Sequence, residues 1–156
     1  MSRQHINHYR RTLAEQHRVT GSLNESVVRK AFADLLERTG RAHDLVFTNE
    51  WEGRGPRSNI IKVDGALVPA ILRKPFGYWE AKDSKDDLDK EIALKLQAGY
   101  PDDNIIYEDT RVAVLRQDGR EALRVALDSD DGLLELLAAF YAYERPELFL
   151  LVCHRK

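Results

Sequence analysis

The apolar positions of this chain recur at two different periods, which divide it into expected helices and strands. A spacing of three or four residues, typical of one face of an α-helix, occurs in residues 22–40, 84–99 and 130–143. Ser22 is a predicted N-cap for the first helix, with Glu25 three residues later completing a capping box. Ser84 is the corresponding predicted cap of the second helix.

Short apolar or alternating runs predict six strands: residues 45–51, 60–68, 76–83, 104–108, 111–116 and 123–127. A turn at residues 117–120 joins the last two into a hairpin. Strand 104–108 follows a helix, so we expect it to lie parallel to a strand of the first group. The predicted fold is α/β, a mixed central sheet flanked by helices.

Composition is that of a single soluble globular domain. Of the 156 residues, 43% are hydrophobic and 32% are charged. We expect residues 1–20 to form an N-terminal helical arm and residues 21–156 the main domain. The apolar run at 148–152 suggests either a domain cut from a longer polypeptide or a short final strand. No signal peptide or membrane span is recognisable, and Cys153 is the single cysteine, so a cytoplasmic location is expected.

Net charge constrains how the chain could bind nucleic acid. The formal charge is −2, whereas proteins that hold DNA through electrostatics are usually basic. We therefore expect weak DNA binding by this chain alone, with help from catalytic metal ions or from a partner domain.

Candidate chemistry is concentrated on the second and third predicted strands. Asp64 lies on one and Glu80-Ala81-Lys82 on the next, and alternation places Glu80 and Lys82 on one face with Ala81 on the other. Two carboxylates can bind a hard divalent cation, and a neighbouring lysine can orient water. This pattern is typical of a metal-dependent hydrolase that cuts phosphodiesters.

The order of elements, with an acid on one strand, Glu-x-Lys on the next and a helix after it, resembles the PD-(D/E)xK nuclease superfamily. The resemblance covers about residues 22–108, and Val63 stands where the family has proline. It implies a restriction-endonuclease-like core and Mg²⁺-dependent hydrolysis of DNA by metal-activated water, with Mn²⁺ as a substitute. In that scheme Asp64, Glu80 and the Ala81 carbonyl bind the metal, and Lys82 positions the water.

A narrower resemblance is carried by Gly77-Tyr78-Trp79-Glu80-Ala81-Lys82-Asp83, by residues 86–92, by Gly99-Tyr100-Pro101 and by residues 104–108. These segments are similar to the N-terminal nuclease domain of single-chain type ISP and type IIG restriction–modification enzymes. The resemblance implies helicase-like or methyltransferase domains in the same polypeptide. Cutting both strands with one site per chain also suggests transient dimerisation on DNA.

Two further site residues are implied with alternatives left open. Glu25 could reach the metals from the first helix, or serve only in its capping box. Gln97 resembles a glutamine of the exonuclease-like branch and could orient Lys82 or a phosphate, or face solvent. Tyr100 and Asp83 lie nearby without an assigned role.

Two other functions remain compatible with the sequence. One is a stand-alone DNA repair or junction-resolving nuclease. The other is a catalytically silent nuclease-like docking module, which the presence of all three of Asp64, Glu80 and Lys82 argues against.

Overall fold

A computed structural model describes residues 2–145, and within them six strands form one mixed sheet. The strands follow the chain order β1-β2-β3-β4-β5-β6, and neighbours are antiparallel except for the parallel pair β3 and β4. The strands are β1 (Leu45–Arg54), β2 (Ile60–Pro69), β3 (Gly77–Ala81), β4 (Asn104–Glu108), β5 (Val112–Gln117) and β6 (Arg120–Ala126). The helices are α1 (Ser2–Thr20), α2 (Glu25–Arg41), α3 (Leu88–Gln97) and α4 (Asp130–Tyr141).

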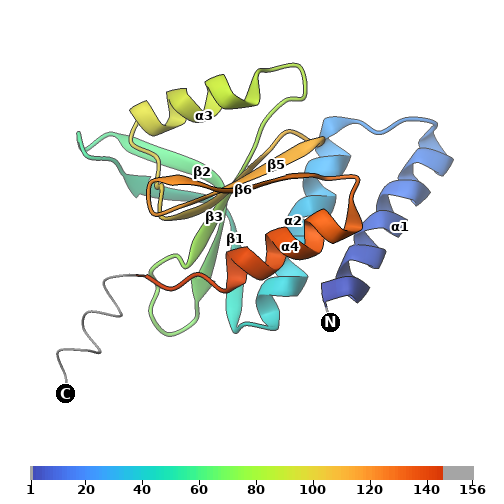
Figure 1. The fold of residues 1–156 in the computed structure, drawn as a ribbon, viewed down its shortest axis with the longest axis horizontal. Coiled ribbons are helices and arrows are strands. Elements are labelled where there is room, and N and C mark those ends of the chain that lie inside the picture. Colours follow the sequence, from blue (N-terminus) through green and yellow to red (C-terminus); the bar gives the residue numbers. More distant parts are fainter. Residues whose placement is uncertain (1, 146–156) are drawn as a thin grey trace.

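Helices cover both faces of the sheet (Figure 1). Helices α1, α2 and α4 pack on one face, and α3 packs on the other. Helix α3 carries the chain from the end of β3 back to the start of β4, so β4 runs parallel to a strand of the first group, as predicted, and that strand is β3. No helix of the described part of the chain is both long and apolar enough to cross a membrane.

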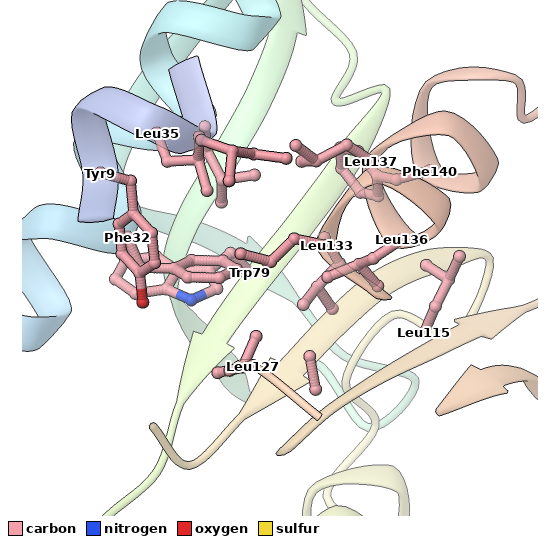
Figure 2. Close-up of a cluster of buried hydrophobic side chains, with 14 of the residues drawn as sticks. Tyr9, Phe32, Leu35, Trp79, Leu115, Leu127, Leu133, Leu136, Leu137 and Phe140 are labelled. Carbon is pink, nitrogen blue, oxygen red and sulfur yellow. The ribbon is translucent and has the colours of Figure 1, made fainter. Parts of the chain in front are cut away.

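Trp79 lies near the centre of the larger hydrophobic core (Figure 2). Its ring stacks on that of Phe32 from α2, with 6.0 Å between the ring centroids. Ala81 belongs to the same core, whereas Tyr78 belongs to the second core, beneath α3. The alternation predicted for β3 is therefore confirmed, and Glu80 lies on the α3 face.

The predicted N-cap of α2 was wrong. Asn24 is the cap, and its side-chain oxygen accepts the Val27 N–H at 2.9 Å. Ser22 lies outside the helix, where its carbonyl accepts the Thr20 hydroxyl at 2.8 Å. Because the helix begins at Glu25, that residue cannot occupy the third position that a capping box requires.

The predicted start of α3 was also too early. Asp87, not Ser84, caps this helix, and its carboxylate accepts the Lys90 N–H at 3.3 Å. Ser84 lies in the preceding turn, beside Asp83, whose carboxylate accepts the Lys85 N–H at 2.9 Å and thereby has a lowered pKa. An acidic N-cap suits the positive end of the helix dipole.

The β5–β6 hairpin forms as predicted. Asp118 and Gly119 have φ values of 52° and 83°, as expected for the two central residues of a type I′ turn. Strand β1 is longer than expected and continues to Arg54. The apolar run at 148–152 lies outside the described residues.

Candidate active site

Strands β2 and β3 bring Asp64 and Glu80 together. Their register pairs Gly65 with Trp79, and one step further along it are Asp64 and Glu80. Here side-chain hydrogen bonds replace the regular ladder. The Asp64 N–H donates to Glu80 Oε1 at 3.0 Å, and the Ala81 N–H donates to Asp64 Oδ2 at 2.9 Å. Each carboxylate is thus held by a backbone N–H of the neighbouring strand.

The face alternation of β2 is interrupted at Asp64. Val63 and Leu67 are four positions apart and would share a face of a regular strand, yet they pack in different cores. On β1, Glu50 lies between the residues paired with Gly65 and Val63, and its φ of 54° is in the left-handed region. This local irregularity turns the Asp64 side chain toward β3, where its carboxylate accepts the backbone N–H of Ala81.

Lys82 directly follows β3, and its ammonium lies among carboxylates. Its Nζ is 3.4 Å from Glu80 Oε2 and 3.9 Å from Glu91 Oε2 on α3. Its backbone N–H donates to the Glu108 carbonyl at 2.7 Å, which extends the β3–β4 pairing past the end of the strand. Only 14% of the Lys82 side chain is exposed, so the ammonium is held close to Glu80.

Burial shifts the pKa of both Glu80 and Lys82. Burial raises the pKa of Glu80, and the negative charge of Asp64 adds to this effect. The Asp64 N–H and the neighbouring lysines act in the opposite direction. Burial also lowers the pKa of Lys82, which the charge of Glu80 opposes. The ionised pair therefore depends on close cationic partners for Glu80.

Helix α3 contributes two charged residues that the sequence motifs did not indicate, Lys95 and Glu91. The Nζ of Lys95 is 3.5 Å from Glu80 Oε2, the same oxygen that Lys82 approaches. Ile92 is buried and marks the side of α3 that faces the sheet. Glu91 and Lys95 are four residues apart on that side, so the signal was their helical spacing around a buried position.

Gln97 is not brought to the site. It is two residues from Lys95, about 200° around the helix axis, and lies on the exposed side of α3. Within residues 2–145 its side chain makes no hydrogen bond to Lys82. The nearby position that does connect to the site is Tyr100. Its hydroxyl accepts from Lys95 Nζ at 3.2 Å and donates to the Lys62 carbonyl at 2.7 Å.

Glu25 binds the turn that follows Lys82. Its carboxylate accepts the backbone N–H of Ser84 at 3.2 Å and the Ser84 hydroxyl at 3.4 Å. Glu25 and Ser84 also line a cavity of about 240 Å³, to which neither Asp64 nor Glu80 contributes. Glu25 therefore fixes the segment just after Lys82, in place of the capping box that the sequence suggested.

The arrangement of Asp64 and Glu80 fits a hard divalent cation. One oxygen of each carboxylate accepts a backbone N–H, which leaves Asp64 Oδ1 without a hydrogen bond among residues 2–145 and Glu80 Oε2 facing two ammonium groups. In the same range, no three histidine, cysteine or carboxylate side chains gather into a metal site. A metal here would rely on two carboxylates, completed by backbone oxygen and water, which suits Mg²⁺.

Comparison with known proteins supports the fold. No protein-family model matches this chain, and no curated protein sequence matches it. Among solved structures, a chain of the DrdV–DNA complex determined by cryo-EM is similar, with a TM-score of 0.87 and 38% sequence identity over 94% of this chain. The present chain spans only 14% of that chain's length. Together with the mixed six-stranded sheet, this likeness confirms the predicted α/β fold with a restriction-endonuclease-like core.

Proposed function

We propose that this chain is a Mg²⁺-dependent DNA endonuclease module of the PD-(D/E)xK type. The observation that carries the proposal is the arrangement of Asp64, Glu80 and Lys82. Two carboxylates from neighbouring strands are each anchored by a backbone N–H, and a lysine ammonium lies 3.4 Å from Glu80 Oε2. Such fixed side chains need little reorganisation when a substrate arrives.

In this proposal the residues have separate roles in phosphodiester hydrolysis. Asp64 Oδ1, Glu80 Oε2 and the Ala81 carbonyl would hold the cation. Mg²⁺, or Mn²⁺ in its place, polarises the phosphate and lowers the pKa of water when bound. Lys82 orients the attacking water and balances charge that develops on the phosphate. Water adds to phosphorus as one P–O ester bond breaks, which yields a phosphate monoester and a free hydroxyl.

We further propose that the module works inside a restriction–modification polypeptide. The similar chain belongs to a complex with DNA, and the present chain spans 14% of its length. The formal charge of −2 also favours an arrangement in which other domains bind the DNA and this module cuts it. Helicase-like or methyltransferase domains of the same polypeptide are the proposed partners. Transient dimerisation on DNA would supply a second site for the second strand.

The test is nicking of supercoiled plasmid by this chain at high concentration with Mg²⁺ or Mn²⁺. We expect Lys82→Ala to lower the rate by about 100-fold or more, because it removes a charge placed at the reacting phosphate. Lys90→Ala is the matched control, since Lys90 lies on the exposed side of the adjacent helix. It should leave the rate unchanged.

Three outcomes would contradict this proposal or favour another function. Undiminished nicking by Glu80→Ala would exclude this site. Cutting restricted to branched DNA would favour a junction-resolving nuclease. If the wild type neither nicks DNA nor binds metal, even with the partner domains supplied, a silent docking module would be favoured.

A further inference from the structure

Two ammonium groups share one carboxylate oxygen in the candidate site. Glu80 Oε2 is 3.4 Å from Lys82 Nζ and 3.5 Å from Lys95 Nζ. The Glu80 side chain is only 4% exposed, so these cations, more than solvent, offset its charge. Its other oxygen accepts the Asp64 N–H at 3.0 Å, which leaves Oε2 as the oxygen open to a further cation.

Each lysine also has a second partner away from Glu80. Lys82 Nζ is 3.9 Å from Glu91 Oε2. Lys95 Nζ donates to the Tyr100 hydroxyl at 3.2 Å and lies 4.8 Å from the centroid of that ring. Either ammonium can thus move off Glu80 Oε2 and keep a favourable contact, as replacement by another cation would require.

The Tyr100 contact is itself anchored to the strand that carries Asp64. The Tyr100 hydroxyl donates to the Lys62 carbonyl at 2.7 Å, so its lone pairs are directed to accept from Lys95. Lys62 precedes Asp64 by two residues on β2. The second position of Lys95 is therefore fixed relative to the carboxylates.

We propose that Lys95 is a positioning residue that competes with a divalent cation for Glu80 Oε2 and so sets the metal affinity of the site. The inference rests on the proposed function, because it takes Glu80 as a metal ligand. With the metal bound, the Lys95 ammonium leaves Glu80 Oε2 and stays within the site through the contact it already makes with Tyr100. Lys82 does not take part in this competition and remains beside the substrate.

The experiment is calorimetric titration of the chain with Mn²⁺, without DNA. Lys95→Met keeps most of the aliphatic stem and removes the charge. It should bind Mn²⁺ about tenfold more tightly or better, because a positive charge 3.5 Å from Glu80 Oε2 is removed. Tyr100→Phe should bind several-fold more weakly, because Lys95 then lacks the hydrogen bond to the Tyr100 hydroxyl and depends more strongly on Glu80 Oε2. Lys90→Met should match the wild type.

Opposite shifts from two variants of one contact cannot arise from loss of folding, and thermal unfolding of each variant checks this directly. Unchanged or weaker Mn²⁺ binding by Lys95→Met would overturn the inference. Asp64→Asn in the same titration separates the two levels. If it abolishes binding while Lys95→Met has no effect, only the role of Lys95 fails. If it leaves binding unchanged, or if the wild type and Lys95→Met both bind no Mn²⁺, the proposed metal site fails as well.

Discussion

Glu108 makes the stability of this protein depend on pH in an unusual direction. Its side chain is buried next to Trp79, at the end of β4. Burial raises its pKa from the ordinary value of 4.5 to about 7, although it accepts hydrogen bonds from Trp79 Nε1 at 3.2 Å and from the Thr110 N–H at 2.8 Å. The folded protein therefore binds a proton here that the unfolded chain releases near pH 4.5.

The sign and size of the effect follow from this difference. Between pH 4.5 and about 7 the folded state holds more protons than the unfolded state, so the free energy of unfolding falls as pH rises. At about 1.4 kcal/mol for each pH unit, the loss amounts to about 3 kcal/mol and levels off above pH 7. The free energy of unfolding of a domain is typically about 5–15 kcal/mol, so this loss is roughly one fifth of it or more.

Glu108→Gln isolates this contribution, because glutamine has nearly the same shape and does not titrate. The amide can accept only one of the two hydrogen bonds well, which costs about 1–2 kcal/mol at every pH. Urea unfolding of both proteins from pH 4.5 to 8 should give a difference that changes by about 3 kcal/mol in favour of the variant. Glu15→Gln, on the exposed side of α1, is the control and should give no such change. Parallel curves for the wild type and Glu108→Gln would contradict the raised pKa of Glu108 in the folded protein.

Two further predictions concern the fold. Asn24→Ala should lower the free energy of unfolding by about 1 kcal/mol through loss of the bond to the Val27 N–H, whereas Ser22→Ala should change it by less than about 0.5 kcal/mol. Urea unfolding compares the two, and equal losses would argue against Asn24 as the cap. Gly77→Ala should destabilise the protein by about 1–3 kcal/mol, because the added Cβ would lie 2.5 Å from the Phe140 ring. An unchanged melting temperature would contradict this packing.

Much of the architecture could be predicted from local pattern. Short apolar or alternating runs predicted all six strands, and the helix before residues 104–108 predicted that this strand lies parallel to a strand of the first group, which is β3. The proximity of Asp64 and Glu80 was also predictable, since consecutive strands of a hairpin pair with each other and the hydrophobic pattern and the turn set their register. The exact caps were not, because Ser22 and Asn24 are both good capping residues and local sequence alone does not choose between them.

Tertiary structure decided which side chains complete the candidate site. The sequence selected Gln97 on α3, but the rotation of this helix depends on how Leu88 and Ile92 pack against the sheet. That rotation turns Gln97 to solvent and brings Lys95 to Glu80. For Glu25 the sequence left open a role at the metal site or in a capping box, and only the approach of α2 to the turn after β3 gives it Ser84 as a partner.

The local pattern therefore predicts the six strands, their mixed arrangement in one sheet and the candidate residues Asp64, Glu80 and Lys82, because these depend on short apolar or alternating runs and on contacts between neighbouring strands. The tertiary structure alone decided the contacts of Lys95 and Glu25 and the burial of Glu108. Those properties depend on the angle and rotation at which helices pack on the sheet. Such quantities come from the sum of many weak apolar contacts across the core, which no single motif encodes.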